Sequence, residues 1–94
     1  MAEIRQKPRS RCRLYADILR VIKQSDNVKI THLLHTVNVP YDRLVSYMSD
    51  MEEQGLIEKS GDGSTSYVIA PKGLKYLEEF RKVDEFSRLF GVEI

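Results

Sequence analysis

Basic side chains concentrate at the start of the chain, and such side chains could neutralise the phosphates of a nucleic acid. Residues 1–13 hold five cations against one acid, a formal charge of 5 − 1 = +4. Each phosphate contact would release condensed counterions, so binding would weaken as salt rises. We predict that residues 1–9 form a flexible basic arm, with a solvated tail as the alternative. The candidate phosphate ligands are Arg5, Lys7, Arg9, Arg11 and Arg13.

A second set of candidates lies in and just after residues 41–54. Arg43 could donate two hydrogen bonds to guanine, while serine and tyrosine hydroxyls could reach a base or the DNA backbone. This segment has one cation against four acids, 1 − 4 = −3. It is therefore better suited to selecting a sequence than to holding DNA, or else it is an acidic surface that docks another protein. The candidates are Tyr41, Arg43, Ser46, Tyr47 and Lys59.

Residues typical of catalysis or metal binding are few. His32 and His35 could share a helix face, but two histidines without a third ligand make a weak metal site. No nucleophile elbow, phosphate-binding glycine loop or HExxH pair is present in the sequence, so we predict no enzyme and no cofactor or metal. A regulator that senses metal or thiol chemistry through these histidines or Cys12 is a further alternative.

The composition predicts one ordered domain. The chain has 94 residues, of which 41% are hydrophobic and 31% charged, which is typical of a folded domain of this size. No apolar run approaches the roughly 20 residues of a membrane span. The basic N-terminus lacks the apolar core of a signal peptide, so we expect a cytoplasmic protein.

The order of helix and turn signals predicts a helix-turn-helix. Ser10 can cap a first helix whose apolar residues recur at helical spacing. Residues 28–30 alternate like a short strand, and Thr31 can cap a second helix. Asn38 suits the left-handed residue that ends this helix, and Pro40 suits the start of the next. That third helix spans about 41–54 and ends at Gly55.

Two strands and a long helix complete the chain. Residues 56–60 and 65–69 are rich in strand formers, and the glycine-rich turn at 61–64 between them predicts a hairpin, or wing. The last helix should span about 72–90. Part of its apolar stripe extends past what so small a domain can bury, which implies a partner surface. We assign a dimer interface to Tyr76, Phe80, Val83, Phe86 and Phe90.

Several motifs resemble those of the small archaeal winged-helix DNA-binding proteins typified by a Sulfolobus nucleoid-associated protein. The motifs are YADIL at 15–19, NVPYDRL at 38–44, GLI at 55–57 and YVIAPKGL at 67–74. The resemblance implies a winged helix whose third helix enters the major groove of double-stranded DNA. It also implies that the last helix pairs with its twin as an antiparallel coiled coil.

Together these observations predict an α+β, mainly α, winged helix-turn-helix domain over 10–71, followed by a dimerisation helix over 72–94. We expect a homodimeric, sequence-selective transcription regulator, cytoplasmic and associated with the nucleoid. The alternatives are a protein-interaction module of the same fold and a general DNA packaging protein. The expected core is Leu14, Ile18, Ile22, Leu34, Leu44, Met48, Met51, Leu56, Val68, Leu74 and Leu77.

Overall fold

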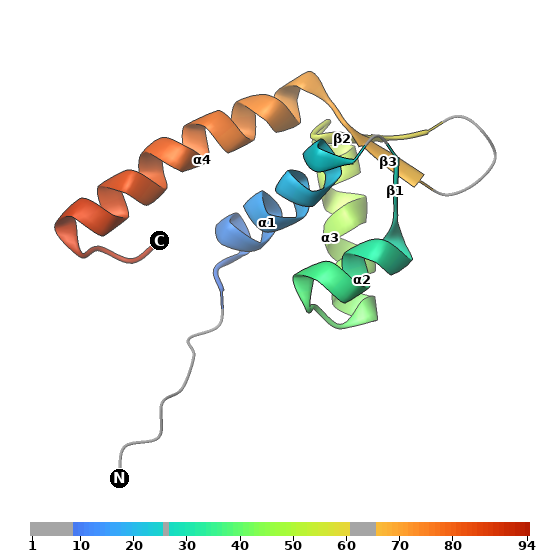
Figure 1. Cartoon of the computed structure of the whole chain (residues 1–94), viewed down its shortest axis with the longest axis horizontal. Coiled ribbons are helices and arrows are strands. Elements are labelled where there is room, and N and C mark those ends of the chain that lie inside the picture. The colour runs from blue at the N-terminus through green and yellow to red at the C-terminus, as the bar shows by residue number, and fades with distance from the viewer. Residues whose placement is uncertain (1–8, 26, 61–65) are drawn as a thin grey trace, which may run out of the picture.

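Helices and short strands follow one another in the order that the sequence predicts (Figure 1). The computed structural model describes residues 9–25, 27–60 and 66–94. The mainly helical α+β winged-helix prediction is confirmed. The elements are α1 (Arg11–Gln24), β1 (Val28–Lys29), α2 (Ile30–Val37), α3 (Tyr41–Glu53), β2 (Ile57–Lys59), β3 (Ser66–Ile69) and α4 (Pro71–Phe90).

Helix α1 lies at the centre of the fold and contacts α2, β3 and α4. Its first turn is capped as predicted, because the backbone N–H of Arg13 donates a hydrogen bond to Ser10 Oγ at 3.1 Å. Ile18 and Leu19 are completely buried. Burying two such side chains stabilises the fold by about 1.5–3 kcal/mol each. The apolar face of α1 therefore organises the core.

The helix-turn-helix is formed by α2 and α3. Asn38 has a φ of 53°, the left-handed conformation predicted for it, and Gly55 ends α3 with a φ of 81°. Helix α2 starts at Ile30 rather than after a Thr31 cap, and its N-cap position is Lys29. The reason is that the strand pairing of β1 leads directly into the helix, which leaves no free residue for a separate cap.

The three strands form one antiparallel sheet in the order β1–β3–β2. Val28 pairs with Tyr67, and Ile57 pairs with Ile69. The predicted short strand at 28–30 is thus present, although it has two residues. The predicted hairpin has its two strands, β2 and β3, while its predicted turn at 61–64 lies outside the described residues.

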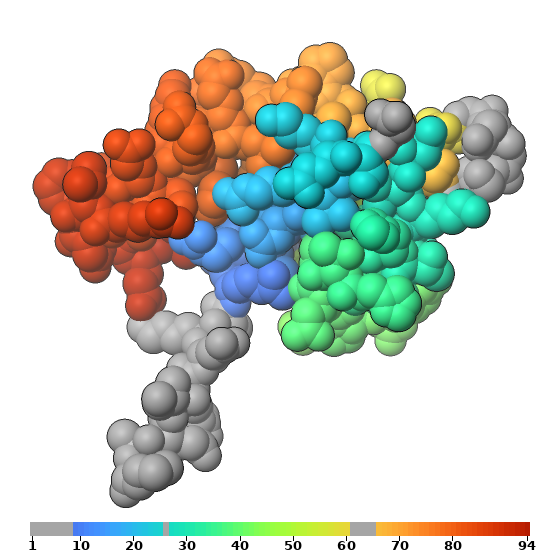
Figure 2. Space-filling view, viewed as in Figure 1, coloured from blue at the N-terminus to red at the C-terminus, as the bar shows by residue number. Residues whose placement is uncertain are grey.

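Helix α4 lies along α1, and its C-terminal half extends past it (Figure 1). Pro71 stands in the first turn, where its missing N–H costs little. Gly91, with a φ of 66°, ends the helix. Figure 2 shows the C-terminal end of α4 (red) on the far side of the molecule from α2 and α3 (green).

Two parts of the core prediction are wrong, and both concern α4. Leu74 was expected in the core but is 43% exposed, whereas Phe80 was expected beyond the core but is 3% exposed. Gly73 and Phe80 are buried seven residues apart on one face of α4. Gly73 lies against Leu56 and Ile69, whereas Phe80 lies beside Arg13 and Arg20 of α1. Leu74 lies about 100° around the helix from Gly73. The expected core residues that are only partly buried are Leu34, Val68 and Leu77.

Candidate nucleic-acid interface

Three of the predicted DNA-binding residues are exposed in the first two turns of α3. Arg43 and Ser46 are exposed, and Tyr41 is 55% exposed. Leu44 and Met48, on the side of the helix away from Arg43 and Ser46, are buried in the core. The first two turns of α3 therefore present a guanidinium and two hydroxyl groups that no core contact holds.

Tyr47 has a different environment from these three residues. Its ring is half-buried and meets the Tyr15 ring edge-on, with 5.6 Å between the ring centroids. The guanidinium carbon of Arg11 lies 6.0 Å from the Tyr47 ring centroid. Arg43 precedes Tyr47 by four residues and shares its side of α3. The start of α1 thus lies beside the side of α3 that carries Arg43.

One acid of α3 is turned away from solvent by a contact with α1. The Tyr15 hydroxyl donates a hydrogen bond to Asp50 Oδ2 at 2.5 Å. Burial, followed by the hydrogen bond to Asp50, raises the pKa of Tyr15 from 10.0 to about 12. Asp50 is half-buried. This carboxylate therefore opposes an approaching phosphate less than its place in the sequence suggests.

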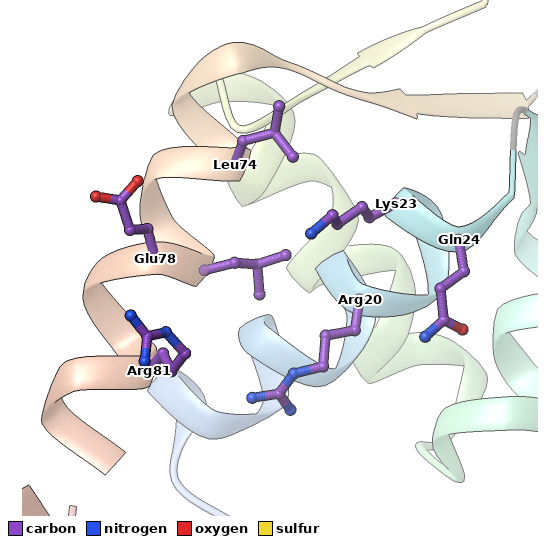
Figure 3. A pocket seen from close by; sticks show the side chains of 7 residues that line it. Arg20, Lys23, Gln24, Leu74, Glu78 and Arg81 are labelled. Carbon is purple, nitrogen blue, oxygen red and sulfur yellow. The ribbon is translucent and has the colours of Figure 1, made fainter. Parts of the chain in front are cut away.

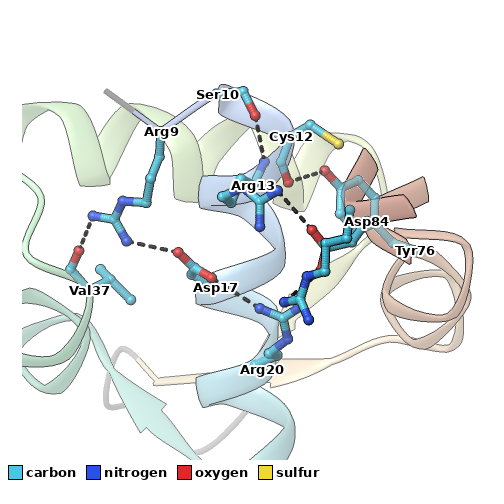
Figure 4. A network of polar contacts seen from close by, with 10 residues as sticks. Arg9, Ser10, Cys12, Arg13, Asp17, Arg20, Val37, Tyr76 and Asp84 are labelled. Atoms are coloured by element: carbon cyan, nitrogen blue, oxygen red, sulfur yellow. Dashed lines mark hydrogen bonds and ion pairs between the residues drawn. The ribbon is translucent and has the colours of Figure 1, made fainter. Parts of the chain in front are cut away.

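The cations of the predicted basic arm fall into two groups in the structure. Arg5 and Lys7 lie outside the described residues. Arg9, expected in a free arm, instead donates to Asp17 at 2.8 Å and to the Val37 carbonyl at 2.6 Å (Figure 4). This contact fixes residue 9 beside the end of α2. The chain therefore enters the domain next to the helix-turn-helix.

Arg13 ties α4 to α1 and is not a free phosphate ligand. Its Nη2 donates to Asp84 at 2.8 Å (Figure 4), and its guanidinium carbon lies 5.4 Å from the Phe80 ring centroid. This hydrogen bond, followed by the charge of Arg88, lowers the pKa of the Asp84 carboxyl. The charge of Arg13 is thus paired with Asp84 within the chain, and its contact with DNA stays a prediction.

In the described part of the wing, Lys59 is exposed at the end of β2 and pairs across the sheet with Tyr67. Lys29, which sequence reasoning did not assign, is exposed at the other edge of the same sheet. The alternation of apolar Val28 and Ile30 with Lys29 indicates that Lys29 is exposed, because successive residues of a strand face opposite sides of the sheet.

Three of the five predicted dimer residues are exposed in the C-terminal half of α4. Val83 is 44%, Phe86 53% and Phe90 67% exposed, and the Phe86 and Phe90 ring centroids lie 4.9 Å apart. Tyr76 is instead half-buried and donates to the Cys12 carbonyl at 2.7 Å. Its burial raises its pKa.

Phe80 must be removed from the predicted dimer surface, since it packs against α1 within the same chain. Two further residues, Leu89 at 71% and Val92 at 50% exposed, enlarge the apolar area. A helix end with this much exposed apolar surface is typical of an interaction site.

His32 and His35 are both exposed on α2, and Cys12 is exposed in the first turn of α1. Within the described ranges, no three histidine, cysteine or acidic side chains are close enough together to hold a metal ion. A search of the same ranges finds no helix that could span a membrane.

Comparison with known families agrees with this geometry. A family model described as "Winged helix-turn-helix" matches residues 8–88. The chain belongs to this family, whose domains are typically non-enzymatic and suggest DNA binding. No curated protein matches the chain.

Proposed function

We propose that the chain is a sequence-selective regulator of transcription that binds double-stranded DNA as a homodimer. The observation that carries this proposal is the exposure of Arg43 and Ser46 on one side of α3, with Tyr41 exposed in its first turn. Arg43 shares its side of α3 with Tyr47, whose ring lies beside Arg11 at the start of α1. The hydrogen bond from Tyr15 to Asp50 supports the same proposal, because it directs this carboxylate toward α1.

In this proposal Arg43 reads a guanine in the major groove, which is wide enough to admit an α-helix. Ser46 and Tyr41 contact a base edge or the DNA backbone. Arg11 and Lys59, both exposed, neutralise phosphates on either side, together with Arg5 and Lys7 of the arm. Direct contacts set the sequence preference, while these cations supply much of the affinity.

The dimer is proposed to form through α4. Val83, Phe86 and Phe90 supply an apolar surface that this chain alone leaves exposed. An antiparallel coiled coil of two α4 helices would place two recognition helices at a fixed spacing, and that spacing would match two half-sites on DNA. Membership of the archaeal nucleoid-associated group, and association with the nucleoid, stay predictions that accompany this arrangement.

Selection of bound duplexes from a random pool tests the proposal. We expect a defined sequence to be enriched. Arg43→Ala should weaken binding to that sequence by about 1–3 kcal/mol and should reduce the base preference at one position of the site. Lys82→Ala is the matched control, since Lys82 is an exposed cation of α4 that pairs with Glu79. It removes the same charge and should leave the preference unchanged.

The other outcomes separate the alternatives. Binding to every duplex with no enriched sequence would indicate a packaging protein. No binding at low salt would refute the DNA-binding proposal and favour the protein-docking alternative. A monomer in light scattering, with binding intact, would refute the dimer alone.

A further inference from the structure

A hollow between α1 and α4 lies outside the proposed DNA-binding surface. Its volume is about 590 Å³, within the range of small-molecule sites, roughly 300–1,000 Å³. We propose that this hollow binds a small organic carboxylate with an apolar body. This inference does not depend on the function proposed above. The lining residues are Arg20, Lys23, Gln24, Leu74, Leu77, Glu78 and Arg81.

The charges of the hollow favour an anion. Its lining includes three cations and one acid, a formal charge of 3 − 1 = +2. In Figure 3 Lys23 reaches from α1 toward α4, whereas the Glu78 carboxylate points away from α1. The acid is thus poorly placed to neutralise a cation that comes from α1.

Two of these cations are unpaired within the described residues. Neither Lys23 nor Arg81 forms a hydrogen bond or an ion pair with any other described residue. Arg20 differs, since it donates to Asp17 at 3.1 Å and its guanidinium carbon lies 5.7 Å from the Phe80 ring centroid. Lys23 and Arg81 come from different helices and line the same space. A carboxylate between them would bridge α1 and α4.

The apolar residues of the hollow specify the rest of the ligand. Leu74 is 43% exposed and Leu77 is partly buried. Neither leucine would contribute to binding a hydrated inorganic anion. An aromatic or branched aliphatic body would remove leucine surface from water, with a gain of about 25 cal/mol for each Å² buried. The ligand class is therefore an amphipathic monocarboxylate rather than a phosphate or sulfate.

The test is a titration of the full chain with sodium benzoate, followed by the methyl NMR signals of Leu74 and Leu77. Benzylamine, which keeps the ring and reverses the charge, and acetate, which keeps the charge without the ring, are the matched ligands. We expect saturable shifts with benzoate. Benzylamine and acetate should each bind at least about tenfold more weakly, because benzylamine loses the charged contacts and acetate loses the apolar contacts.

Charge reversal locates the site. The double variant Lys23→Glu, Arg81→Glu should weaken benzoate binding about tenfold or more, because two attractive contacts become repulsive. The control is Lys29→Glu, Lys82→Glu, which makes the same change in net charge at exposed positions outside the hollow. It should bind benzoate like the wild type. Circular dichroism confirms that both variants are folded.

Three results would overturn the proposal. The first is the absence of saturable shifts at these leucines, and the second is equal binding of benzylamine. The third is equal binding by the hollow variant and its control. In that last case benzoate would be held by another apolar surface, such as the exposed end of α4.

Discussion

Phe80 and Phe86 lie on the same helix, but the structure gives them different roles, which substitution by alanine can separate. Phe80 is 3% exposed, and the guanidinium carbons of Arg13 and Arg20 lie 5.4 and 5.7 Å from its ring centroid. Phe80→Ala should therefore lower the free energy of unfolding by about 3–5 kcal/mol, the usual cost of emptying a core site of this size. Phe86 is 53% exposed, so Phe86→Ala should cost the single chain about 0.5 kcal/mol or less.

The assay is urea unfolding followed by far-UV circular dichroism at two protein concentrations. At low protein concentration we expect Phe80→Ala to lower the free energy of unfolding by this large amount and Phe86→Ala to leave it almost unchanged. At high concentration Phe86→Ala should lose stability relative to the wild type, because the proposed assembly through α4 would stabilise the folded chain by mass action. Phe80→Leu keeps much of the buried volume and should recover part of the loss.

Equal losses for the two alanine variants at low concentration would refute this reasoning. So would a loss below about 1 kcal/mol for Phe80→Ala, since such a value is typical of a surface position. Either result would mean that α4 does not pack on α1 through Phe80.

Three further predictions concern contacts between distant parts of the chain. Tyr15→Phe should cost about 1–1.5 kcal/mol at neutral pH by leaving Asp50 without its donor. The raised pKa of Tyr15 favours the protonated folded state, so the wild type should lose stability as pH rises from 10 to about 12. In urea unfolding, the Tyr15→Phe variant should lose less of its free energy of unfolding than the wild type does between pH 10 and about 12. Asp84→Asn should lower the melting temperature at pH 7, and the difference from the wild type should shrink in acid, because the lowered pKa of Asp84 makes its contribution vanish as pH falls. Gly73→Ala should lower the melting temperature by several degrees, because a Cβ there would collide with the carbonyl oxygen of Leu56.

The local features of the fold could be predicted from sequence because neighbouring residues determine them. Asn38 ends α2 in the left-handed conformation, and Gly55 ends α3 in the same way. Ser10 caps α1 through the N–H three residues later. Each signal depends on backbone geometry within one turn of the chain. The boundaries of the helix-turn-helix followed from these signals to within a residue or two.

The site was harder to predict because its charges are paired across long distances in sequence. Asp50 is separated by 35 residues from the hydroxyl that binds it, and Arg13 by 71 residues from its carboxylate. Periodicity shows which side of a helix is polar, but it does not show which polar residue meets a partner there. Arg13 was therefore assigned to DNA although it stabilises the packing of α4.

The hollow between α1 and α4 could not be inferred from sequence for the same reason. Lys23 and Arg81 are ordinary surface cations in the sequence, and Leu74 was expected in the core. Their juxtaposition follows from the rotation of α4 that directs Phe80 toward α1.

The central claim is that this domain binds double-stranded DNA through α3 and its surrounding cations. The most direct test is fluorescence anisotropy of a labelled duplex titrated with the full chain, between about 50 and 200 mM salt. We expect saturable binding at low salt that weakens about a thousandfold over this range if about six phosphates are contacted. Arg43→Ala should weaken binding at every salt concentration. No change in anisotropy at low salt, on random or genomic duplexes, would contradict the claim.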